Sequence, residues 1–261
     1  MKNFRGFTLL EVLFAVFVGM LLMAAAYVSI STGQKTAAGV ERKVAAQQDV
    51  RTAMQMMAMD ISMASYNPNY VSGFWHDPQN VTFGQILQCT PSPAQANKGI
   101  REATPTSLTI EMDLNADNTV GAAGEIIRYQ YLTNFQAITR EAPACLSSRD
   151  PALVSFLLGD DPTTGNPRTV RVINNDLNIL NANGQVAIFR YYDAAGMGTE
   201  VFPNCLTGTE TSCAEISKIR RIDICLAVQT DEIDPSTQQP RSLIYSTSVQ
   251  VRNHGLGPEG A

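Results

Sequence analysis

The pattern of hydrophobic and polar positions begins with one long apolar stretch. Residues 12–34 carry no formal charge, and Lys35 is the next charged position. At about 1.5 Å per residue this run is roughly 35 Å long as a helix, and a bilayer core is about 30 Å thick. The sequence therefore predicts a membrane-spanning helix close to the N-terminus.

The next stretch has the spacing of an amphipathic helix, because apolar positions recur at steps of three and four. The members of this stripe are Val40, Val44, Gln47, Val50, Met54, Met57, Ile61 and Ala64. No glycine or proline interrupts the pattern between Val40 and Tyr66, and Pro68 ends it. We therefore expect one continuous helix from Phe7 to about Ser65, whose outer half, residues 31–66, packs on a globular head.

The remainder of the chain alternates in short runs, as half-buried strands do. Residues 67–107 are rich in Pro, Asn, Gln and Ser and predict an irregular connector. Strand patterns follow at Ser107–Asp113, Glu125–Leu132, Phe135–Arg140, Val154–Leu158, Thr169–Ile173, Val186–Tyr192, Ile219–Val228 and Leu243–Val251. The expected fold is α+β, with a β-rich antiparallel head over residues 67–253 and a flexible, glycine-containing tail over residues 254–261.

An acidic residue, Glu11, lies at the start of the apolar stretch and requires an explanation. An ionised side chain in a membrane span costs about 2.5–3.5 kcal/mol even on lenient insertion scales, so it is normally retained for a function. A short basic leader with Lys2 and Arg5 ends at Gly6. If the chain were cut there, Phe7 would carry a new α-ammonium four residues from Glu11. Each charge would need an opposite charge in apolar surroundings. Glu11 of one helix is then able to neutralise either its own terminus or that of a staggered neighbour.

This leader, the Gly-Phe junction and the sequence Phe-Thr-Leu-Leu-Glu resemble the prepilin cleavage site of type IV pilins and type II secretion pseudopilins. The resemblance implies that residues 1–6 are a leader peptide and that a peptidase cuts between Gly6 and Phe7. It also implies N-methylation of Phe7, a filament core formed by residues 7–30, and Glu11 as the assembly acid. The proline that many members carry in the spanning helix is absent, with Val28 at that place.

The head carries a second resemblance, in Gly99-Ile-Arg, in Gly124-Glu-Ile-Ile-Arg-Tyr and in Ile138-Thr-Arg140. These segments are similar to the globular half of larger minor pilins and of the J-type pseudopilin. The implied function is that of a structural subunit, a minor pilin acting in initiation or near the tip of a type IV pilus. A J-type pseudopilin of type II secretion is the alternative.

The resemblance also implies partners and a location. The partners are other pilin or pseudopilin subunits, prepilin peptidase, the inner-membrane assembly platform and, before assembly, membrane lipid. The protein is expected as a single-pass inner-membrane protein with a periplasmic head, and later in an extracellular or periplasmic filament.

Other interpretations of the N-terminus and of the head stay open. A secretory signal peptide cut after Ala26 and an unprocessed membrane anchor share the basic start and apolar core. A pilus-tip adhesin or a DNA-uptake subunit on the same stalk is a further alternative, for which an exposed loop around Phe74 and Trp75 would be evidence. The formal net charge is −5, and −7 without Lys2 and Arg5, so nucleic acid is not an expected partner.

One loop has the spacing of a calcium site, because oxygen-bearing side chains stand at alternate positions. The candidate ligands are Asp113, Asn115, Asp117, Thr119 and Glu125. Glu125 stands one place after the position where a calcium loop normally has its bidentate acid. A polar hairpin loop without metal is the alternative, and no cofactor is required for the function above.

Five cysteines leave at least one thiol unpaired within the chain. The topology implied by the resemblance places the head outside the cytoplasm, where disulfides persist. We expect a disulfide between Cys205 and Cys213 and a second between Cys89 and Cys145. Cys225, in an apolar run, is the expected free thiol.

Candidate catalytic residues are scarce. The histidines, His76 and His254, fall in the predicted connector and tail, without a setting that orients a catalytic base. Zinc-binding spacing and a glycine-rich phosphate loop are also absent from the sequence. We therefore predict a protein that is not an enzyme, with a membrane-anchored hydrolase as the alternative.

Overall fold

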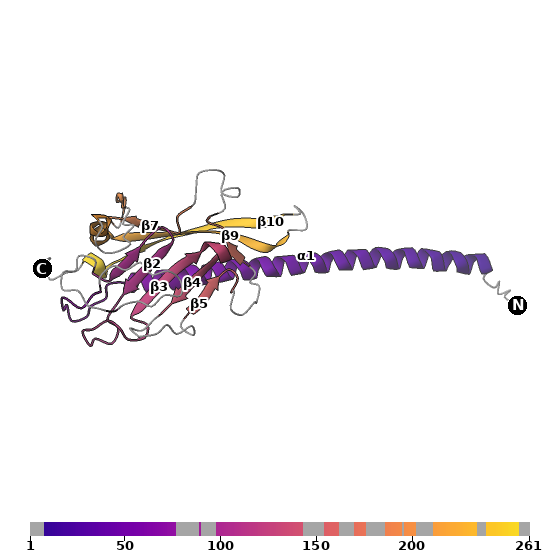
Figure 1. Ribbon diagram of the computed structural model, residues 1–261. Coiled ribbons are helices and arrows are strands. Elements are labelled where there is room, and N and C mark those ends of the chain that lie inside the picture. Colours follow the sequence, from indigo (N-terminus) through magenta and orange to yellow (C-terminus); the bar gives the residue numbers. More distant parts are fainter. Residues whose placement is uncertain are drawn as a thin grey trace.

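The computed structural model describes residues 8–76, 89, 98–142, 154–161, 170–175, 186–194, 196–201, 211–233 and 239–255. It consists of one long helix and a head built from two antiparallel sheets (Figure 1). The α+β fold predicted from the hydrophobic pattern is therefore confirmed, and the arrangement is consistent with a pilin fold.

The helix, α1 (Leu9–Met63), has 55 residues and is therefore about 82 Å long. Its N-terminal half projects away from the head (Figure 1). It is long and apolar enough to cross a bilayer, and its most apolar window buries nothing against the rest of the described protein.

The C-terminal part of α1 packs against both sheets in one shared core. Its buried residues are Ala46, Val50, Ala53, Met54, Met57, Ile61 and Ala64. The predicted stripe is thus confirmed from Val50 onward, whereas Val40 and Val44 are exposed. Among the side chains of the helix that the structure describes, the first buried one is Ala46, well inside the predicted docking segment 31–66.

The first sheet is a meander in which each strand pairs with the next, in the order β1-β2-β3-β4-β5. Its strands are β1 (Ile100–Ala103), β2 (Ser107–Glu111), β3 (Ile126–Leu132), β4 (Ala137–Glu141) and β5 (Val154–Leu158). The second sheet has the order β10-β9-β7-β8, and β6 also pairs with β9. Its strands are β6 (Val170–Val172), β7 (Phe189–Tyr192), β8 (Glu200–Val201), β9 (Arg221–Ile233) and β10 (Pro240–Gln250).

Short 3-10 helices complete the described secondary structure, at Thr133–Phe135, Thr211–Lys218 and Asn253–Gly255. All eight strands predicted from alternation are found. The prediction of an irregular connector over residues 67–107 was wrong at its end, because β1 pairs there with β2. The two-residue strand β8 was not predicted.

The last turns of α1 are fixed to the first sheet by polar contacts. The Tyr129 hydroxyl and Arg140 Nε both donate hydrogen bonds to Asp60 Oδ2, the latter over 2.8 Å. Just after the helix, Ser65 has a left-handed backbone with φ of 63°, and its N–H donates to Glu111 O over 2.9 Å. These contacts position the helix end over β2, β3 and β4.

His254 is buried, which corrects the prediction that it begins a flexible tail. Its Nδ1 lies 2.9 Å from Ser65 Oγ, and its Nε2 lies 2.8 Å from Ile216 O. The ring therefore has partners for both nitrogens beside the end of α1, and this long-range pairing is invisible in the local composition. Residues 256–261 lie outside the described residues.

Candidate processing and assembly site

The first turn of α1 is closed by a reciprocal capping box. Thr8 is the N-cap, with φ of −78° and ψ of 151°. Its backbone N–H donates to Glu11 Oε2 over 3.2 Å, and Glu11 N–H donates to Thr8 Oγ1 over 3.3 Å. The Thr8 hydroxyl also donates to Glu11 Oε2 over 3.3 Å. The Glu11 carboxylate is thereby turned back toward the start of the helix, where the helix dipole favours negative charge.

The predicted processing residues stand immediately before this cap. Gly6 and Phe7 lie outside the described residues, so cleavage between them and methylation of Phe7 stay predictions. Thr8 is the residue that follows Phe7. The Glu11 carboxylate is therefore bonded to a backbone N–H only one residue beyond the predicted new terminus.

Thr8 was not singled out from the sequence, although a usable signal was present. Thr8-Leu9-Leu10-Glu11 fits the S/T-x-x-E pattern that marks a capped helix start. Glu11 was singled out only as an acid in an apolar run. The structure adds that this acid already has a local partner in the uncleaved chain.

The surface around Glu11 is apolar and exposed. Large apolar side chains here are more than half exposed; among them are Leu9, Leu10, Leu13, Phe14 and Phe17. An apolar surface of this extent on a soluble monomer marks an interaction or membrane surface. It requires either lipid or the helices of other subunits around it, and Glu11 then requires a polar or charged partner within that environment.

The predicted calcium ligands are brought into one loop but do not share one environment. Asp113 and Glu125 are buried, whereas Asn115, Asp117 and Thr119 are exposed. Asp117 Oδ1 accepts hydrogen bonds from Thr119 N and Oγ1 over 2.8 and 2.6 Å, which lower its pKa. Its Oδ2 accepts from Asn115 Nδ2 over 2.9 Å. Within the described ranges, no group of three or more His, Cys, Asp or Glu side chains is arranged to hold a metal.

The cysteines are described in part. Cys89 is disulfide-bonded, but its predicted partner Cys145 lies outside the described residues, as does Cys205. The side chain of Cys213 is likewise not described, so both pairings stay predictions. Cys225 is a free thiol, and partial burial raises its pKa.

Both histidines have buried structural partners. His76 Nδ1 lies 2.9 Å from Glu111 Oε1. The other ring, His254, contacts the Ser65 hydroxyl, but that hydroxyl donates to Lys98 O and both residues are almost fully buried. The Ser65–His254 pair thus joins chain segments and presents no exposed nucleophile.

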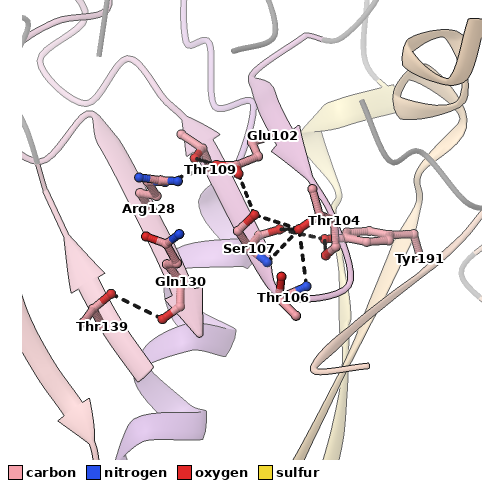
Figure 2. Close-up of polar contacts among 9 residues, drawn as sticks. All are labelled: Glu102, Thr104, Thr106, Ser107, Thr109, Arg128, Gln130, Thr139 and Tyr191. Carbon is pink, nitrogen blue, oxygen red and sulfur yellow. Dashed lines mark hydrogen bonds and ion pairs between the residues drawn. The ribbon is translucent and has the colours of Figure 1, made fainter. Parts of the chain in front are cut away.

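A buried polar cluster in the first sheet joins the two sheets rather than forming an open site (Figure 2). Glu102 accepts hydrogen bonds from Ser107 Oγ over 2.5 Å and from Arg128 Nε over 3.1 Å. From β7, the Tyr191 hydroxyl donates to Thr104 O over 2.7 Å. Burial raises the pKa of Tyr191 well above its ordinary value, so its hydroxyl remains a donor.

Comparison with known proteins bears on the N-terminal segment alone. Residues 1–27 match the family described as the prokaryotic N-terminal methylation motif, the signature of type IV pilins and pseudopilins. This signature implies a precursor that prepilin peptidase processes and that assembles with other pilin subunits, and its family is structural rather than enzymatic. No curated protein and no solved structure matches the chain.

Proposed function

We propose that this chain is a minor pilin, a structural subunit that is cleaved between Gly6 and Phe7, methylated at Phe7 and assembled through α1. The observation that carries the proposal is the exposed apolar half of α1 with its one carboxylate, Glu11, in the first turn. The match to the methylation motif covers residues 1–27 and so includes most of this half-helix. Before assembly the apolar half spans the inner membrane, and the head lies on the periplasmic side.

Glu11 acts as the register residue of the filament. In the precursor its carboxylate is bonded to Thr8. Cleavage creates an α-ammonium on Phe7, and a buried ammonium without an opposite charge costs several kcal/mol. When apolar helices stack with an axial stagger, the Phe7 ammonium of one subunit pairs with Glu11 of its neighbour. Only one stagger satisfies both charges, and the apolar contacts hold the helices together in that stagger.

The head favours a place at the initiating or tip end of the filament. It contains two five-stranded sheets in addition to the docked helix, and its segments at Gly99, Gly124 and Ile138 resemble those of larger minor pilins. A subunit with so large a head suits a position needed once per filament. A J-type pseudopilin of a type II secretion filament is the alternative, because the same head segments and the same N-terminal motif resemble that class as well.

The adhesin or DNA-uptake alternative has less support from the structure. An exposed aromatic loop would favour it, but Phe74 and Trp75 are buried, with ring centroids 4.4 Å apart. A negative net charge also gives no general attraction to nucleic acid.

Substitution of Glu11 tests this function. Glu11→Ala and Glu11→Gln are expected to leave the protein processed and in the membrane, but to reduce its recovery in sheared filaments at least about tenfold, because each removes one buried charge partner. The matched control is Glu41→Ala, which removes an exposed acid from the same helix beyond the apolar run. Wild-type recovery of Glu11→Ala in filaments would refute the register role.

A further inference from the structure

The part of α1 between its apolar half and the docked half has no support from the rest of the described protein. Beyond the head, α1 continues as a single helix with no other labelled element beside it (Figure 1). None of the described side chains from Thr32 to Ala45 is buried, a stretch of 14 residues. Isolated helices shorter than about 12–15 residues are marginally stable in water, even when they are rich in alanine. The helical structure of this stretch therefore depends on its own sequence.

The first residues of this stretch form helices poorly. Of the nine residues 31–39, five are Ser, Thr or Gly, and all three types have a lower helix propensity than alanine. Thr32 Oγ1 donates to Val28 O over 2.9 Å, and Thr36 Oγ1 donates to Thr32 O over 3.0 Å. Such bonds from a side chain to the carbonyl one turn back slightly destabilise a helix and often bend it. Residues 31–39 are thus a weak segment within an otherwise regular helix.

The two glycines of this segment have no packing role in the described structure. A Cβ on Gly33 or on Gly39 would meet nothing within 4 Å. Gly99 is the opposite case, because a Cβ there would lie 2.7 Å from Ser65 Cα. Gly33 and Gly39 therefore lower the stability of the helix without allowing any close contact. Sharp bends in helices are found at glycine and serine positions of this kind.

We infer that residues 31–39 are a hinge at which the head changes its angle to the apolar half of α1. Lys35 is the first charged residue after the uncharged run 12–34, so the hinge lies where the helix leaves the bilayer. The parts of α1 on either side are held in place, one by lipid and the other by the head from Ala46 onward. Bending of the chain is therefore concentrated between them.

The hinge gives the head a choice of orientations on one anchored helix. A subunit that passes from the bilayer into a filament has to turn its head relative to the apolar half of α1, and residues 31–39 supply that freedom without disturbing the core. This use of the hinge rests on the proposed function, whereas the bending itself does not.

Hydrogen exchange tests the weakness of the segment, on the uncleaved full chain in bilayer nanodiscs, purified from cells without prepilin peptidase. We expect the backbone amides of residues 33–39 to exchange at least about 100-fold faster than those of residues 50–61 in the same helix. The double variant Gly33→Ala, Gly39→Ala should slow exchange of the segment at least about tenfold. Gly19→Ala is the matched control, because a Cβ there also meets nothing within 4 Å, and it should leave exchange of the segment unchanged.

A distance measurement between two spin labels tests the bending. Tyr27 and Met59 are 74% and 70% exposed and stand on either side of the hinge. Nitroxide labels on Tyr27→Cys and Met59→Cys, in a Cys225→Ser background, would be about 48 Å apart along a straight helix. We expect a broad distribution that extends to shorter distances, and a single narrow distance in the double alanine variant.

Two results would overturn the hinge. One is exchange of residues 33–39 as slow as that of residues 50–61. The other is a single narrow distance near that of the straight helix in the wild type, which would exclude bending even if the segment exchanged fast. Both measurements use the precursor, in which no new terminus is formed. Their failure would therefore leave the processing and register roles untested by these data, and failure of the Glu11 variants would leave the hinge standing.

Discussion

His254 Nδ1 lies 2.9 Å from Ser65 Oγ, so the last described 3-10 helix of the chain is bonded to the end of the first helix. Lys98 O lies 2.9 Å from the same imidazole nitrogen, and Ile216 O lies 2.8 Å from the other. This one imidazole thus lies within hydrogen-bond distance of three segments that are remote in sequence, and as a neutral ring it donates its single N–H to one of the two carbonyl oxygens. The head around the end of α1 depends on that ring remaining neutral.

Stability of the head should therefore fall in mild acid through His254. Burial lowers the pKa of His254 from 6.5 to about 4, and the charges of Arg220 and Lys98 act in the same direction. The unfolded chain takes up a proton below pH 6.5, which the folded chain resists until about pH 4. The stabilisation is complete above the unfolded pKa and is lost as the pH falls through this window. Between pH 7 and pH 5 the loss should be about 2 kcal/mol.

Denaturant unfolding of the full chain in detergent, followed by Trp75 fluorescence, measures this loss. The His254→Gln variant is expected to be less stable at pH 7 but to lose about 2 kcal/mol less than the wild type between pH 7 and pH 5. Equal losses in the two proteins would assign the acid sensitivity to other groups.

Gly99 should tolerate no side chain, because the backbone of Ser65 occupies the space. A Cβ on Gly99 would lie 2.7 Å from Ser65 Cα and 2.9 Å from Glu111 O, and Gly99 has φ of 81°. Gly73 has a similar φ of 83°, but a Cβ there would meet nothing within 4 Å. Gly73→Ala should cost about 1 kcal/mol through its backbone alone, and Gly99→Ala about 3 kcal/mol or more. Thermal melting of both variants checks this, and similar losses would show that the contact at Gly99 is easily relaxed.

The contact of Tyr129 with Asp60 should contribute measurably to docking of α1 on the first sheet. The Tyr129→Phe variant lacks the hydroxyl that donates to Asp60 Oδ2. Of the two donors described above, only Arg140 Nε is then left. The expected loss is about 1–2 kcal/mol in unfolding free energy. Tyr70→Phe, at a side chain that is 65% exposed, is the control and should change little. If Tyr129→Phe lost no more unfolding free energy than the control, the Tyr129 hydroxyl would not contribute to the docking of α1.

One cysteine, Cys225, should react when the unreduced protein is denatured and alkylated. The chain has five cysteines, and the predicted pairs 89–145 and 205–213 occupy the others. Peptide mapping should locate the label on Cys225, and Cys225→Ser should take up none. Label on Cys205 or Cys213 would contradict the disulfide that we predict between these two cysteines.

Local periodicity explains what was predictable in the fold. The stripe through Val50, Met57 and Ile61 repeats at helical spacing, and each long strand alternates over enough residues to be recognised. β1 was missed because Ile100–Ala103 has four residues and follows a segment rich in turn-forming residues. No short-range pattern distinguishes such a strand from a connector before its partner strand is known.

The candidate site residues likewise divide into those that a local sequence pattern reveals and those that it does not. Glu11 is recognisable because a carboxylate in an apolar run is unusual wherever it occurs, and Thr8 is recognisable from its spacing to Glu11. The burial of Asp113 and Glu125 cannot be recognised from the sequence, because both residues stand in a polar stretch that suggests solvent exposure. The position of His254 depends on contacts with Ser65 and Ile216, which only the folded chain brings together.

The intact mass of the mature protein, isolated from cells with and without prepilin peptidase, tests the assembly role most directly. Processing as proposed predicts that residues 1–6 are lost and one methyl group is gained only when the peptidase is present, with Phe7 as the N-terminal residue. A mass that does not change, or a mature chain that begins after Ala26, would contradict it, because in the first case no new ammonium forms near Glu11 and in the second Glu11 itself is removed.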